Sequence, residues 1–335
     1  MTNISTFNLS QMTDLVSRSF TEWPKKLLTT MRNAPFVKED TINGGTFKRY
    51  AEMVHTSQYA RKRAEGDKSA QALAQYGYEK DLAVTPFSYQ ISITKLMRTG
   101  NKEPEILKKI TDLSESIPLA IDLDLSHRFT FSGATTYTNR DGETVDISTG
   151  DGLALASASH TLTGSSTTFS TVITSNPVFS KTSLITAEKS FVEATFDNLG
   201  ALVAANPNVI LTTADPETCI AVKELMNSTA TTTVDQNSGV VNVFQNKYQH
   251  VIGYRIATTA AGGVDTTKSK RWALIDSNLS DFYFTVLQEA QLSSPTKGNN
   301  GEDISSGNWT YVVDAIYGMC IVTPRAFRIS NWSWS

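Results

Sequence analysis

The sequence predicts a mixed α+β fold, and three observations lead to that prediction. Residues 103–128 carry Ile and Leu at steps of three and four, which is the spacing of one helix face. Runs rich in β-branched and aromatic residues, such as 87–94 and 309–322, alternate apolar with polar positions as strands do. Helices and strands do not alternate regularly, and no internal period is visible. We therefore expect neither a parallel α/β fold nor a repeat array.

Composition limits the classes to which the chain can belong. It has 335 residues, 40% of them hydrophobic, which suits about two core-forming units at the usual domain size. No apolar stretch reaches the roughly 20 residues of a membrane-spanning helix. Residues 1–19 lack a basic start and a continuous apolar run, so we expect no export signal and no membrane association. The net charge of -3 argues against a dedicated nucleic-acid binder.

Residues 1–43 are expected to form an amino-terminal arm. Ser10 can cap an amphipathic helix, and Pro24 interrupts or restarts it. A helix this short has no core of its own, so its apolar stripe must dock on the body or on a neighbouring chain. The predicted docking residues are Met12, Leu15, Val16, Phe20, Trp23, Leu27 and Met31.

Residues 44–97 are expected to form a long β-hairpin. Its strands are predicted at 46–50 and 87–94, after the Asn43-Gly44-Gly45 turn. The segment between them is densely charged with both signs, which favours a projecting tip that contacts another subunit. The predicted contact residues at this tip are Arg61, Lys62, Arg63, Glu65, Asp67 and Lys68. An isolated hairpin is only marginally stable, so this one needs a surface to lie on.

Residues 98–200 are expected to form a peripheral domain around the long helix at 103–128. Pro118 should bend this helix, because its ring removes one backbone hydrogen bond. Residues 152–180 contain no charged side chain and are expected to form loops or weak strands. A second helix is predicted at 184–196, capped by Thr182 or Ser183, and a turn follows it at 197–200.

Residues 201–300 are expected to form an axial domain. A short buried strand is predicted at 209–211, and Asp215-Pro216 opens a helix that runs to about Asn227. Further strands are predicted at 251–258, 272–275 and 282–287. Residues 301–335 are expected to supply a carboxy-terminal strand that returns to the peripheral domain.

Chemical signatures are sparse. The histidines lie in separate segments, and the common nucleophile, phosphate-loop and dinucleotide motifs are missing from the sequence. Asp122 and Asp124 do not have the geometry of a shared site, since residues two apart face different sides of a helix. Glu302 and Asp303 are adjacent in a Gly/Asn-rich loop, where carboxylates are ordinarily solvated. Cys219 and Cys320 are interpreted as small buried hydrophobes. We predict no enzyme activity, no metal and no cofactor.

The order of elements resembles the major capsid proteins of tailed bacteriophages, the HK97-like fold, and within it the Mu-like and related heads. The residues that carry the likeness are the 87–94 strand leading into the long helix, Asp151-Gly152-Leu153-Ala154-Leu155 with Ser159-His160, Asn198-Leu199-Gly200, and the passage from Asn206 to Asp215-Pro216. The closing strand, Gly318 to Arg328, also falls in the family's order. Alanines stand at 154 and 156, where the family's Asp-Gly-x-Pro-Leu-Phe-x-x-x-His stretch often has Pro and Phe.

The resemblance implies a head protein that assembles into hexamers and pentamers of an icosahedral shell around double-stranded DNA. It also implies the family's projecting hairpin, known as the E-loop, with the long helix as its spine. Expected partners are further copies of the chain, a separate scaffolding protein, a portal and a decoration protein, with only weak contact to the DNA. The expected location is the virion, assembled in the cytoplasm of a host bacterium.

Three other functions stay open at the level of sequence. An encapsulin-type nanocompartment shell shares the same fold and would be distinguished by its cargo. A phage tail or adhesion protein would share the Ser/Thr/Asn-rich β content but would more often show repeats. A hydrolase without a recognisable motif is the third.

Overall fold

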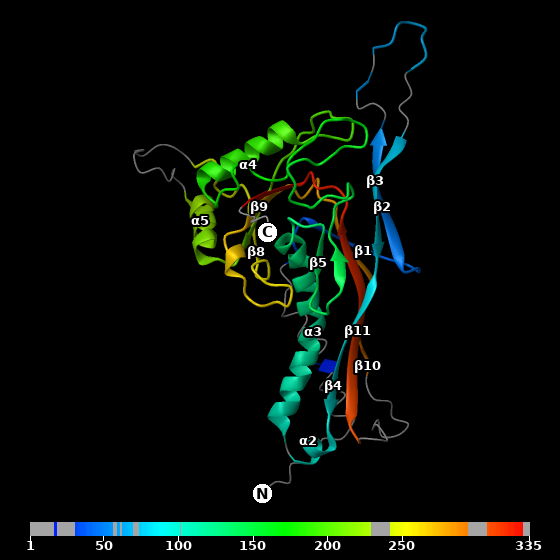
Figure 1. The fold of residues 1–335 in the computed structure, drawn as a ribbon, viewed down its shortest axis with the longest axis vertical. Helices are drawn as coiled ribbons and strands as arrows, with labels where there is room; N and C mark the ends of the chain where they lie inside the picture. The colour runs from blue at the N-terminus through cyan, green and yellow to red at the C-terminus, as the bar shows by residue number, and fades with distance from the viewer. Residues whose placement is uncertain are drawn as a thin grey trace.

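The structure is a computed structural model that describes residues 17–18, 31–55, 59–60, 62–69, 74–100, 102–228, 242–293 and 307–330. It confirms the α+β class, and the molecule is long and narrow (Figure 1). A hairpin projects at one end of the long axis, and helix α2 (Lys95–Thr99) lies at the other. Within the described residues, no helix combines the length and the apolar character needed to cross a membrane.

The larger sheet and the long helix form the main core. The sheet has the order β1-β10-β11-β4, with β1 parallel to β10 and the other pairs antiparallel. Its strands are β1 (Val37–Thr41), β10 (Phe282–Ser293), β11 (Trp309–Ile321) and β4 (Thr85–Ile93). Helix α3 (Glu103–Thr130) packs on β4 and β11 through Ile106, Ile110, Leu113, Ile117 and Leu125, the stripe that the sequence predicts.

A second sheet has buried residues on both faces. Its order is β12-β9-β7-β8, made of β12 (Phe327–Ser330), β9 (Trp272–Ile275), β7 (Val209–Thr213) and β8 (Gln249–Gly253). Ile210 and Trp272 face a cluster with helices α4 (Lys181–Ala194) and α5 (Pro216–Asn227). Their neighbours Leu211 and Ala273 belong to the main core instead. The sheet therefore separates two apolar clusters.

The predicted strand at 46–50 is confirmed as part of the hairpin, but the predicted partner at 87–94 is not. Strand β2 (Phe47–His55) pairs with β3 (Ala74–Ala83), whereas β4 pairs with β11. The prediction that 87–94 is the return strand of the hairpin is therefore wrong. Strand β3 was missed because Gly77 and the charged run 79–81 give it low strand propensity, which packing in the fold overrides.

Several boundaries also differ from the sequence prediction. Helix α4 begins earlier, because Ser180 and not Thr182 or Ser183 is its N-cap, and Ser183 completes a capping box with it. The closing strand is broken, since β11 ends at Ile321 and β12 begins only after Pro324. Cys320 is buried as predicted, but Cys219 is half-buried. The remaining elements are β5 (Thr136–Thr138), β6 (Thr144–Asp146) and a 3-10 turn at Thr266–Lys268.

Candidate subunit interface

The β2–β3 hairpin is divided by a bulge. Ala51 is paired with Glu79, but Met53 is paired with Tyr76, so β3 carries one more residue than β2 across this step. Bulges interrupt the ladder, bend the strands and redirect side chains. The contacts that Tyr50, Glu52 and Tyr78 make with the body lie at or below the bulge, and the hairpin projects from the body at one end of the molecule (Figure 1).

Below the bulge, the hairpin is packed on its own chain. The Tyr50 ring stacks on Tyr283, with the ring centroids 4.1 Å apart. The Tyr50 hydroxyl lies 2.6 Å from Thr285 Oγ1 and 2.8 Å from Asp40 Oδ2. Leu82, Cys320 and Val322 join Tyr50 in a small apolar cluster. Burial raises the pKa of the Cys320 thiol to about 12, so it stays a protonated packing group.

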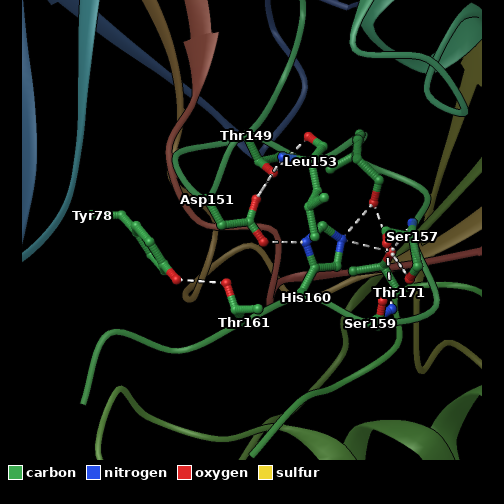
Figure 2. Close-up of polar contacts among 10 residues, drawn as sticks. Tyr78, Thr149, Asp151, Leu153, Ser157, Ser159, His160, Thr161 and Thr171 are labelled. Carbon is green, nitrogen blue, oxygen red and sulfur yellow. Dashed lines mark hydrogen bonds and ion pairs between the residues drawn. The ribbon is translucent and has the colours of Figure 1, made fainter. Parts of the chain in front are cut away.

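At the bulge, both strands are tied to the body by polar contacts. On β2, Glu52 forms a largely buried ion pair with Arg325, which also donates to Asn198 Oδ1 at 3.2 Å. On β3, the Tyr78 hydroxyl lies 2.6 Å from Thr161 Oγ1 (Figure 2). Close to this level, Lys80 Nζ donates to Asp146 Oδ2 at 2.8 Å.

The loop that receives Tyr78 is held by a buried polar network (Figure 2). His160, next to Thr161, places Nδ1 2.7 Å from Asp151 Oδ2, and both side chains are almost fully buried. Burial by itself raises the pKa of the Asp151 carboxyl, but hydrogen bonds from His160 and Thr149 outweigh this and hold the pKa below its ordinary value. His160 Nε2 lies 3.2 Å from Thr171 Oγ1.

Thr171, His160 and Asp151 are linked in the order hydroxyl, imidazole and carboxylate, as in a catalytic triad. Their burial shows that they fix the shape of the loop. The Thr171 hydroxyl donates to Leu155 O at 2.6 Å, and Thr171 and His160 are both fully buried. A nucleophile must reach a substrate, and this hydroxyl has no exposed surface. Asp151 and His160 therefore position the loop carrying Thr161. Asp151 and His160 are among the residues by which the sequence resembles the capsid family.

Beyond the bulge, the hairpin exposes apolar side chains. Met53 is 60% exposed and Tyr76 is 71% exposed, and the two are paired across the strands. Single exposed apolar residues scattered over a surface are ordinary, whereas these two lie side by side on the projecting part of the hairpin. Sequence reasoning missed this pair, although the alternation Phe47, Arg49, Ala51, Met53 gave the signal of a strand face.

The predicted tip residues lie at the far end of the hairpin (Figure 1). Lys62, Arg63, Glu65, Asp67 and Lys68 are all exposed, and Arg61 lies outside the described residues. Arg63 Nη1 donates to Ser69 Oγ at 3.2 Å within the tip. Their contact with another subunit stays a prediction.

Of the predicted arm-docking residues, only Met31 is described. Its side chain is fully buried in the main core, and its backbone N–H donates to Asp122 Oδ1 on α3 at 3.3 Å. Asp122 is also paired with Arg255, at 3.1 Å. Met12, Leu15, Val16, Phe20, Trp23 and Leu27 lie outside the described residues, so docking of the arm stays a prediction.

The carboxylate Asp124 faces a different environment from Asp122. It lines a cavity of about 360 Å³ between α3, β3 and the β5–β6 hairpin, and it accepts a hydrogen bond of 2.9 Å from the Tyr317 hydroxyl. Burial raises the pKa of Asp124. Among the described residues, no cluster of His, Cys, Asp and Glu is placed to hold a metal ion.

Comparison with known proteins finds similarity at the level of structure. No family model matches the sequence, and no curated protein matches it significantly. The fold is similar to those of solved capsids. The capsid structure of cyanophage P-SCSP1u has a TM-score of 0.48 at 12% identity, over 87% of this chain and 85% of the other. The capsid of the native GTA particle has a TM-score of 0.46 at 12% identity, over 90% and 89%. A virus-like particle from Pyrococcus furiosus has a TM-score of 0.43 at 9% identity, over 95% and 98%.

Proposed function

We propose that this protein is a capsid subunit that builds a closed shell from copies of itself, with the distal β2–β3 hairpin packed on a neighbouring copy. The observation that carries the proposal is the exposed Met53–Tyr76 pair on the projecting part of the hairpin. A two-stranded ribbon is marginally stable alone, so its projecting half requires a second surface. A neighbouring copy supplies such a surface at every position of a symmetric assembly.

The rigid base of the hairpin supports the same function. Tyr50, Glu52 and Tyr78 fasten both strands to the body, so the distal half is presented in a defined direction. A contact made by a pre-oriented element loses less conformational entropy on binding than one made by a mobile loop. The interior of the protein is thus built to aim the hairpin.

The finer proposal concerns the particle. The subunits would form the hexamers and pentamers of an icosahedral phage head that encloses double-stranded DNA, with a separate scaffolding protein, a portal and a decoration protein as partners. The net charge of -3 suits a wall that touches packaged DNA without binding it extensively. The subunit would act by assembly, without catalysis.

Assembly of the purified protein tests the proposal. Sedimentation velocity and negative-stain microscopy should show capsomers or shells for the unmodified chain. The double variant Met53→Ser/Tyr76→Ser removes the exposed apolar pair and should shift the protein to free subunits, with an unchanged thermal unfolding midpoint because neither side chain is buried.

The matched control is Val264→Ser, which removes an apolar side chain that is 82% exposed in a surface turn of the body. This variant should assemble normally. Shells of normal size and yield from the Met53→Ser/Tyr76→Ser variant would contradict the role given to the hairpin. A monomer from the unmodified chain at high concentration would contradict the shell function itself.

A further inference from the structure

We infer that the Glu52–Arg325 pair is a latch that sets the direction in which the distal hairpin leaves the body, and that it does so without adding appreciably to the stability of the fold. The inference rests on the proposed function for its biological meaning, since direction matters only if the hairpin has a partner. The latch itself is a property of the free subunit.

The Glu52–Arg325 pair lies at the level where the hairpin register shifts, between the part packed on the body and the distal part. Glu52 is the β2 residue between Ala51 and Met53, at the level where the register shifts, and strand alternation places it on the same face as Tyr50, toward the body. Arg325 lies in the segment between β11 and β12 and holds Glu52 and Asn198 with the same Nη2 atom. One guanidinium therefore joins the hairpin to two separate segments of the body.

Burial of the Glu52–Arg325 pair costs both charged groups their hydration. Both side chains are only 13% exposed, and within the described part of the chain Glu52 Oε2 and Arg325 Nε have no hydrogen-bond partner. Burial raises the pKa of the Glu52 carboxyl, and the attraction of Arg325 does not cancel this effect. Asp281 and Asp197, the other charged groups that act on Glu52, raise it further. Loss of hydration thus outweighs pairing, as is common for buried ion pairs.

The Glu52–Arg325 pair adds little to the free energy of folding, but its geometry is strict, so its main effect is on the direction of the distal hairpin. Hydrogen bonds between charged groups depend steeply on angle, whereas apolar burial is not directional. Replacing the pair with apolar side chains of similar length should keep the fold stable and release the angle of the hairpin. The root of the hairpin is held independently by the stacked rings of Tyr50 and Tyr283, so it should stay in place.

The direction of the hairpin can be measured in free subunits by pulsed electron spin resonance. Spin labels would be placed at Lys62→Cys on the exposed tip and Lys189→Cys on the exposed side of α4, in a Cys219→Ser background because Cys219 is partly accessible. Protein would be kept at a concentration where it sediments as a monomer. The Glu52→Met/Arg325→Met variant should widen the distance distribution at least twofold, with a thermal unfolding midpoint equal to or above that of the parent.

The matched control is Arg49→Gln/Asp81→Asn, which removes an exposed ion pair from the same hairpin. It should leave the distance distribution unchanged. The single variant Glu52→Gln, which keeps the shape of the side chain, should widen the distribution as the double variant does.

An unchanged width in both Glu52 variants would overturn the latch, whether or not the protein forms shells. A double variant with a markedly lower unfolding midpoint would overturn the statement that the pair adds little stability. Failure of the unmodified chain to form shells would refute the proposed function and leave the measurement on the free subunit intact.

Discussion

At the scale of single residues, the buried polar groups decide how the structure responds to acid. His127 and His250 are held neutral, because burial lowers the pKa of each from 6.5 to about 4. The unfolded chain binds protons on these histidines below pH 6.5, whereas the folded chain does not until about pH 4. Stability is therefore lost as the pH falls through this window.

The expected loss is at most about 3 kcal/mol for His127, and smaller for the partly exposed His250. Asp122 and Asp124 act in the opposite sense, because burial raises their pKa values and the folded state binds their protons more readily. Urea unfolding of His127→Gln between pH 7 and pH 4 isolates the histidine contribution, and its stability should fall less steeply than that of the parent. Lys189→Gln, on the surface, should keep the steep dependence. Equal slopes for His127→Gln and the parent would show that His127 does not titrate as stated.

At the scale of elements, the sequence predicted those structures that local pattern determines. The stripe of α3, the Asp215-Pro216 start of α5 and the short buried strands β7 and β9 follow from spacing and capping residues. Strand β3 and the pairing of β4 with β11 did not follow, because partners such as Ile93 and Trp309 are joined only by the tertiary fold. The network around Asp151 and His160 was visible in the sequence only as a family likeness, since its loop has no periodicity.

Helix α3 continues through Pro118 to Thr130. A proline inside a helix removes one backbone hydrogen bond and crowds the preceding turn, so Pro118→Ala should stabilise the free subunit by about 1–3 kcal/mol in urea unfolding. Pro104 lies in the first turn of the same helix, where proline is favoured, so Pro104→Ala should have little effect. A destabilised Pro118→Ala variant would mean that the core requires the shape that proline gives this helix.

At the scale of the whole molecule, contacts at the far end of the hairpin are expected to decide assembly. The tip carries charges of both signs and no large apolar side chain, which suits ion pairs with a neighbouring copy. Reversal of three charges, Arg61→Glu/Lys62→Glu/Arg63→Glu, should block shell formation and leave the fold of the subunit unchanged by circular dichroism.

The acidic residues of the same tip allow a matched test of whether removal of charge has a smaller effect than its reversal. Replacing Glu65 and Asp67 with Gln and Asn removes charge without reversing it, and should weaken assembly less than the triple reversal. Raised salt should weaken assembly of the parent if tip ion pairs contribute, since exposed pairs are screened. Normal shells from the triple-reversal variant would show that the tip is a solvated loop that makes no contact needed for assembly.

The second sheet has a consequence for how this protein can diverge. In β7 and β9, neighbouring residues such as Ile210 and Leu211 belong to different apolar clusters, so both faces are buried. A polar substitution on either face would be trapped in one cluster or the other. Related proteins could differ at nearly every surface residue and still keep continuous apolar segments at 209–211 and 272–275. A search for distant relatives of this chain should therefore compare these two short apolar segments, more than any charged motif.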